Sequence, residues 1–187
     1  TEILYNCLLE NPDNGGIIDV NQLKQNNVKY LVYHPEVSYE GIAINKIPNH
    51  VNKKTLINIE NSGIKTDMID YKKYNLVSNE TKCRPNTGFI ALFDLLSYDI
   101  KELYITGFTF YLDNFMDGYK DHLDKEDFNR RNFNSKRHIQ ENMFQYLKKE
   151  TKKNKLISPD PLLKEILKLE TLNDGKKINL KFIDKKR

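Results

Sequence analysis

The residues with the clearest chemical potential form the segment Arg84-Pro-Asn-Thr-Gly88, which directly precedes an apolar stretch. A glycine beside a threonine at a helix start lets a ligand approach the helix N-terminus, whose amides and dipole favour a phosphate or a carboxylate. Thr87 can donate a hydroxyl hydrogen bond and Arg84 can supply positive charge. The alternative is an ordinary helix start, with Thr87 as N-cap and Gly88 present for packing. Judged by spacing alone, the ordinary helix start is favoured.

Histidines later in the chain are candidates for a general base, because an imidazole accepts a proton near neutral pH. His138 (SKRHIQEN) is preferred, since it stands at the start of a predicted amphipathic helix, and His122 (YKDHLDKED) is the second choice. The alternative for His138 is a surface side chain at a helix start with no chemical role. His34 and His50 are interpreted as loop residues.

The elements that must position these residues alternate between strands and helices. Alternation of this kind predicts an α/β fold, Rossmann-like, with a mostly parallel sheet covered by helices on both faces. The predicted strands are 2–8, 28–33, 103–105 and 155–157. The predicted helices are 19–25, 53–60, 65–73, 87–97, one that starts at 135 or 137 and ends at 149, and 159–169.

A long polar segment, 112–136, interrupts this alternation. It leaves the carboxyl end of the strand at 103–105, where open parallel sheets bind their ligands, and loops of this length are often lids. We expect a lid over the site, the alternative being a surface insertion. The expected organisation is one domain, 1–170, with the lid inside it, followed by a basic tail, 171–187.

Composition limits the partners. The net charge of +4 comes largely from lysine-rich runs, which are typical of solvated faces, and no nucleic-acid signature accompanies them. An anionic membrane surface is a candidate partner, and we expect a cytoplasmic or membrane-peripheral protein. Cys7 and Cys83 lie in no metal-ligand spacing and are expected to be reduced, although one disulfide between them stays open. The chain begins at Thr1, so we expect it to be part of a longer protein.

The segment 84–111, RPNTGFIALFDLLSYDIKELYITGFTFY, resembles the bacterial lipooligosaccharide sialyltransferases. Those enzymes have an arginine, a Ser/Thr-Gly pair, an apolar helix and then a strand of the form K-E-I-Y-x-x-G-x-x-F-Y. The segment is also similar, more weakly, to the small sialylmotif of the animal enzymes. Further on, 155–163 (KLISPDPLL) resembles the strand and Pro-Asn/Asp helix that close the family's domain. The resemblance covers about 82–163.

The resemblance implies a CMP-activated sugar donor. Thr87 and Gly88 then contact the donor sugar, and Arg84 takes the place of the family's arginine. Asn86, in the same motif, is assigned to the donor site with them. Asn6, at the end of the first predicted strand, is expected to contribute an amide there as well; the alternative is a strand-end asparagine that starts a turn.

The resemblance also implies roles in the reaction. Tyrosine hydroxyls stabilise the departing phosphate in such enzymes, which points to Tyr111 at the matching F-Y pair and to Tyr119 inside the expected lid. His138 becomes the general base. Phenolic donors and a helix N-terminus could balance the charge of CMP, so no cofactor and no metal are expected.

The expected function is therefore an inverting glycosyltransferase that moves sialic acid or a related sugar acid from its CMP donor to a glycan or glycolipid hydroxyl. Two features depart from the family. The Gly-x-Gly-Pro-Ser turn that cradles the nucleotide is absent from this sequence, and Thr109 replaces the aspartate that commonly precedes F-Y. These departures favour the alternative, a degenerate transferase domain that serves as a non-catalytic binding or structural module.

Overall fold

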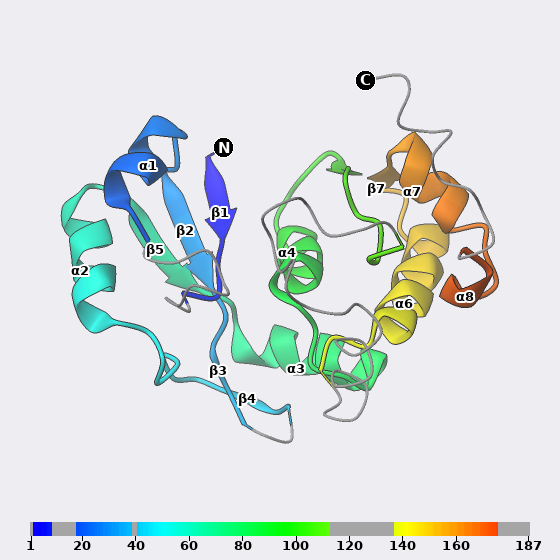
Figure 1. Ribbon diagram of the computed structural model, residues 1–187, viewed down its shortest axis with the longest axis horizontal. Helices are drawn as coiled ribbons and strands as arrows, with labels where there is room; N and C mark the ends of the chain where they lie inside the picture. Colours follow the sequence, from blue (N-terminus) through cyan, green and yellow to red (C-terminus); the bar gives the residue numbers. More distant parts are fainter. Residues whose placement is uncertain (1, 9–17, 39–40, 113–136, 176–187) are drawn as a thin grey trace. The chain divides into compact units, whose positions relative to one another are not determined.

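The structure is a computed structural model that describes residues 2–8, 18–38, 41–112 and 137–175 (Figure 1). It divides into two compact units, each with its own sheet and core. The first unit comprises residues 1–79 and 86–94, and the second comprises residues 80–85 and 95–187.

The first unit is built on a three-stranded parallel sheet in the order β1-β2-β5. Its strands are β1 (Ile3–Tyr5), β2 (Tyr30–Tyr33) and β5 (Lys65–Met68). Helices α1 (Val20–Gln25) and α2 (Lys53–Asn61) cover one face of this sheet (Figure 1). Alternate strand residues point to that face. The core there is formed mainly by Leu23, Leu31, Tyr33, Leu56, Ile59 and Ile64.

Local signals explain where these two helices begin. The Asp19 carboxylate accepts the Asn21 amide at 2.8 Å and caps α1, and the Asn52 side chain accepts the Lys54 amide at 3.0 Å and caps α2. Each bond satisfies an amide that the first turn of a helix leaves without an intrahelical partner. The Asp19 cap confirms the sequence prediction for α1.

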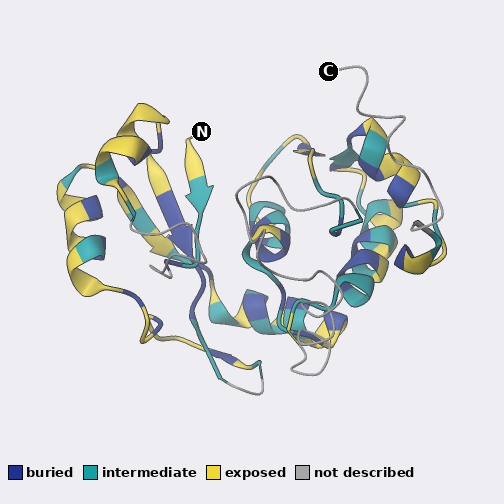
Figure 2. Ribbon diagram, viewed as in Figure 1, coloured by how far each residue is buried: buried dark blue, intermediate teal, exposed yellow. Residues whose placement is uncertain are grey.

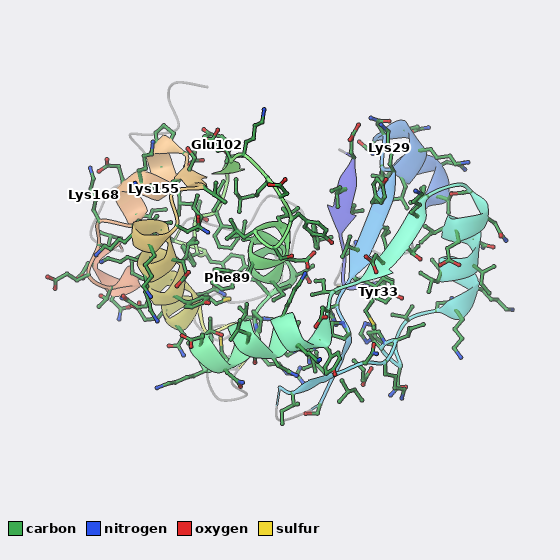
Figure 3. All side chains as sticks on the ribbon, turned by 180° about the vertical axis from the view of Figure 1, so that it is seen from behind. Lys29, Tyr33, Phe89, Glu102, Lys155 and Lys168 are labelled. Carbon is green, nitrogen blue, oxygen red and sulfur yellow. The ribbon has the colours of Figure 1, made fainter. Side chains whose placement is uncertain are left out.

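A small antiparallel hairpin and two more helices complete the first unit. The hairpin consists of β3 (Glu36–Val37) and β4 (Ala43–Ile44). Helix α3 (Tyr71–Thr81) belongs to this unit as far as Asn79, and α4 (Thr87–Leu95) as far as Asp94. Phe89 on α4 is fully buried, and its ring lies 5.1 Å from that of Phe93 (Figure 3).

The second unit is a parallel strand–helix–strand arrangement with two short helices after it. Strand β6 (Leu103–Ile105) pairs with β7 (Ile157–Pro159), and α6 (Gln140–Lys153) connects them in sequence. Helices α7 (Pro161–Ile166) and α8 (Leu172–Gly175) follow. The inward face of α6 is buried (Figure 2). The core of the unit comprises Leu103, Ile105, Phe110, Met143, Phe144, Leu147, Ile157, Leu163 and Ile166.

The sequence predicts the class of the fold correctly, because the described elements form small, mostly parallel sheets flanked by helices. The predicted helix at 65–73 is wrong. Residues Lys65–Met68 form β5, which is held by pairing with β2, and the helix α3 begins only at Tyr71. Helix α6 begins at Gln140 rather than near 137, and the last strand is β7 rather than 155–157. Within the described ranges, no helix has the length and apolarity needed to cross a membrane.

Candidate functional site

In the second unit, hydrogen bonds join the segment around the end of α3 to the segment that leads into α6. The carbonyl oxygen of Arg84 accepts two hydrogen bonds from His138, one from its backbone amide at 2.8 Å and one from ring Nδ1 at 3.1 Å. One turn further along α6, the Asn142 side chain donates to the Thr81 carbonyl at 2.8 Å. Arg84 and His138, two residues that the sequence singles out, are therefore in direct contact although 54 positions separate them.

The bond between His138 and Arg84 fixes the tautomer of the imidazole. A backbone carbonyl can only accept, so Nδ1 must carry the hydrogen. The neutral ring then has its lone pair on Nε2, which is the atom able to take a proton. His138 is half-buried.

Four non-glycine residues in the described part of the second unit have left-handed backbones. His138 has φ 48°, and Lys82, on the other side of the contact, has φ 51°. Phe110 and Tyr111 follow one another with φ 52° and 57°. A Cβ atom makes this region costly, by about 1–3 kcal/mol for each residue, and such strain concentrates at functional sites. Two of the three residues predicted as catalytic, His138 and Tyr111, are among the strained ones.

The turn that carries Tyr111 is held at both ends. At its beginning, the buried carboxylate of Asp160 accepts the Thr106 hydroxyl at 2.9 Å and the Gly107 amide at 3.2 Å. At its end, the buried ring of Phe110 packs edge-on against Phe144 of α6, with ring centroids 5.6 Å apart. Tyr111 is half-buried beside this anchor. The strained conformation is thus maintained by packing and hydrogen bonds on either side of it.

The donor-site candidates Asn86, Thr87 and Gly88 open helix α4 in the first unit. The Asn86 side-chain oxygen accepts the Phe89 amide at 2.8 Å, and the Asn86 backbone carbonyl accepts the Ile90 amide at 3.0 Å. The side chain that caps the helix is therefore that of Asn86, and the alternative with Thr87 as the cap is wrong. Thr87 is half-buried and Gly88 is exposed in the first turn.

Asn6 lies just after β1, at the carboxyl edge of the first unit's sheet. Its side-chain oxygen accepts the Leu8 amide at 2.7 Å, and its own amide donates to the Val32 carbonyl at 2.9 Å. A bond from an asparagine side chain to the amide two residues on is the signature of an Asx turn. The structure thus forms the turn described by the alternative interpretation of Asn6.

Some predicted site residues lie elsewhere. Tyr119 and His122 are outside the described residues, as are the expected lid (112–136) after Leu112 and the expected tail (171–187) after residue 175. Glu141, which lies three residues after His138 and was not predicted as a site residue, makes its side-chain bonds to other residues. Its carboxylate accepts the Gln145 side chain and the Leu172 amide, both at 2.8 Å, and so joins α6 to α8.

Two buried carboxylates were missed by sequence reasoning. Asp160 precedes Pro161, and an aspartate before a proline at a helix start is a signal that could have identified it as a cap. Asp94 lies within an apolar helix; it accepts the Tyr5 hydroxyl at 2.6 Å and faces the Lys73 ammonium at 3.5 Å. The sequence signal for Asp94 was its position within an apolar helix, since a buried carboxylate needs partners.

The two cysteines are free thiols in different surroundings, so the disulfide that the sequence left open is not formed. Burial raises the pKa of the Cys83 thiol, whereas Cys7 is half-buried. Because the thiolate is the reactive form, we expect a thiol reagent to modify Cys7 in the native protein and Cys83 only after unfolding. Titration with a chromogenic disulfide would then give one thiol per chain before denaturant is added and two afterwards. Two fast thiols in the native protein would contradict this expectation.

No group of three or more His, Cys, Asp or Glu side chains suited to a metal ion occurs within the described ranges. Comparison with known proteins assigns no family to this chain, because no family model, no curated protein and no solved structure matches it.

Proposed function

We propose that this chain is an inverting glycosyltransferase that uses a CMP-activated sialic acid or a related sugar acid. The observation that carries the proposal is the state of His138. Its ring is held with Nδ1 toward the Arg84 carbonyl and the lone pair on Nε2, and its backbone is strained. These are properties of a positioned general base. The resemblance of the segment 84–111 to sialyltransferases supplies the reaction, and the finer, Rossmann-like assignment of the fold is part of the same proposal.

In the proposed reaction, His138 Nε2 takes the proton of an acceptor hydroxyl as that oxygen attacks the anomeric carbon of the donor sugar. The bond from the anomeric carbon to the phosphate oxygen of CMP breaks on the opposite side, so the configuration inverts. CMP leaves as a monophosphate and takes the electron pair of the broken bond. The Tyr111 hydroxyl donates a hydrogen bond to the leaving phosphate and stabilises its charge.

The proposal assigns the donor sugar to Thr87 and Gly88. They form the first turn of α4, whose amide-rich end suits the carboxylate of a sialic acid. Arg84 precedes them by three and four positions and provides a cation. A carboxylate and a phosphate are the two anionic groups of such a donor, so both features have a chemical counterpart in it.

Nucleotide binding and CMP release test the proposal directly. Saturating CMP should raise the melting temperature, because a ligand at 100 times its Kd stabilises the folded state by about 2.7 kcal/mol. UMP and AMP, which carry the same phosphate on different bases, are the controls. CMP-sialic acid with a glycan acceptor should then release CMP.

A folded protein that shows neither a CMP-dependent shift nor CMP release would contradict the transferase. It would favour the non-catalytic module instead. A shift that UMP and AMP reproduce would also count against the proposal, because it would reflect a phosphate site without selectivity for cytosine.

A further inference from the structure

The hairpin of the first unit and the turn after it expose an unusual number of isoleucines. Ile42, Ile44 and Ile47 are 57%, 48% and 39% exposed, and they lie within six positions of one another. Between Ile42 and Ile44, Ala43 is buried, so the strand presents both isoleucines on the same, outward face. Large apolar side chains that gather in this way mark a contact surface rather than ordinary scatter.

The same stretch of chain is positively charged. Residues 41–54, called here the Ile–Lys segment, contain three lysines and no aspartate or glutamate. Lys46, Lys53 and Lys54 are all exposed. Glu36, a described carboxylate of the hairpin, accepts hydrogen bonds from the backbone and side chain of Asn49, while Lys46 donates to the same side chain. The lysine charges of the segment are therefore available to an anionic partner.

The combination of charge and apolar surface distinguishes between two kinds of partner. The centre of a protein–protein interface is depleted in lysine, because burying an ammonium is costly. Lys46 stands between Ile44 and Ile47, where a protein partner would have to bury it. At a lipid surface, by contrast, a lysine extends its charged end to the headgroups while apolar neighbours enter the bilayer boundary. The pattern matches the lipid surface.

Several backbone polar groups in the described part of the hairpin are bonded internally, which favours its entry into such a boundary. The Asn75 side chain of α3 accepts the Ala43 amide at 2.7 Å and donates to the Ala43 carbonyl at 2.9 Å. The Glu36 amide donates to the Lys46 carbonyl at 2.7 Å, and the Ser38 amide donates to the Ile42 carbonyl at 2.8 Å. Backbone groups satisfied in this way lower the cost of leaving water.

We propose that the Ile–Lys segment binds the surface of an anionic lipid bilayer. The three isoleucines enter the interfacial region, and the lysines contact the phosphate headgroups. The inference does not depend on the transferase proposal, since it uses no residue assigned to the donor or to the reaction.

Sedimentation of the full chain with lipid vesicles tests the inference. Wild-type protein should bind vesicles of phosphatidylcholine mixed with phosphatidylglycerol, bind pure phosphatidylcholine weakly, and lose affinity as salt is raised. The double substitution Ile42→Asn with Ile44→Asn should lower the partition coefficient about tenfold or more, because two apolar side chains no longer leave water. The matched control is Ile57→Asn on α2, where the isoleucine is 53% exposed outside the segment; it should bind as the wild type does.

The charge contribution has its own pair of variants. Replacing Lys46, Lys53 and Lys54 by glutamine should lower binding to anionic vesicles about tenfold or more, since each lysine near such a surface contributes about 1 kcal/mol. Replacing Lys24, Lys29 and Lys65, exposed lysines of the same unit, removes equal charge and should have a smaller effect. Far-UV circular dichroism checks that every variant is folded.

Three results would overturn the inference. Equal binding to neutral and anionic vesicles would remove the role of the lysines. Unchanged binding by the isoleucine double variant would assign binding to another part of the chain, such as the basic tail. Concentration-dependent self-association that the double variant abolishes would identify the surface as a contact between copies of the chain.

Discussion

Substitution of His138 by asparagine should lower the rate of CMP release about 1,000-fold while the protein stays folded and still binds CMP. The loss follows from the removal of a general base, which contributes about 10²- to 10⁴-fold in rate. Asparagine is the informative replacement, since it tolerates the left-handed backbone that His138 adopts at φ 48° better than most residues. Its side-chain amide can also donate to the Arg84 carbonyl. The fold is thereby preserved while the proton acceptor is lost.

The matched control for this variant is His50→Asn in the first unit. His50 is exposed, and its ring is also bonded to a backbone carbonyl, that of Cys7 at 2.9 Å. It has no assigned role, so turnover should stay within about twofold of the wild type, a difference of less than 0.5 kcal/mol in the barrier. Rates are measured as CMP released from CMP-sialic acid, and CMP binding is measured by the thermal shift. Turnover by His138→Asn close to that of the wild type would contradict the role of His138 as the base.

The sequence predicts the parts of this fold whose causes are local. Helix α1 begins where Asp19 supplies a cap. Helix α4 can be predicted because its nine residues are mostly apolar and follow a polar segment. Strand β6 is a short apolar run followed by Gly107. In each case the residues that decide the structure are neighbours in the chain, so pattern and capping are enough.

The wrong and missing elements have distant causes. Strand β5 has the sequence Lys-Thr-Asp-Met, which shows little apolar alternation, and it is a strand because it pairs with β2. Strand β4 is two residues long and depends on Asn75, 32 positions away. Pairing of this kind overrides local propensity and leaves no mark in a single sequence.

The candidate site divides in the same way. Residue type and motif are enough to single out His138 and Tyr111. What sequence reasoning could not provide is the bond from His138 to Arg84 or the left-handed backbones of both candidates, because these depend on contacts between remote segments. The tautomer of His138 determines which ring nitrogen can accept a proton, and it can be inferred only from that contact.

Substitution of Asp160 by alanine should destabilise the second unit by about 3 kcal/mol. The carboxylate is buried and accepts three hydrogen bonds, from the Leu163 amide at 2.7 Å, the Thr106 hydroxyl at 2.9 Å and the Gly107 amide at 3.2 Å. Loss of a helix cap costs about 1 kcal/mol. The two remaining donors lose a charged acceptor at a buried position, which adds about 1–3 kcal/mol. Because the chain contains no tryptophan, urea unfolding is followed by far-UV circular dichroism.

A second capping aspartate separates the cap from the rest of this effect. Asp19 caps α1 through one bond, to the Asn21 amide, and its side chain is exposed. Asp19→Ala should therefore cost only about 1 kcal/mol, the usual value for an N-cap. Equal losses for the two alanine variants would show that Asp160 does no more than cap α7.

Asp160→Asn tests the link between this carboxylate and the turn that ends at Tyr111. The asparagine oxygen can still accept the Leu163 amide and keep the cap, but its NH₂ group then meets the Gly107 amide, donor against donor. The stability of this variant should fall between that of the wild type and that of Asp160→Ala. If the turn positions Tyr111 for the leaving phosphate, CMP release should fall by more than the loss of folded protein explains. A fall in proportion to the folded fraction would restrict Asp160 to stabilising the second unit.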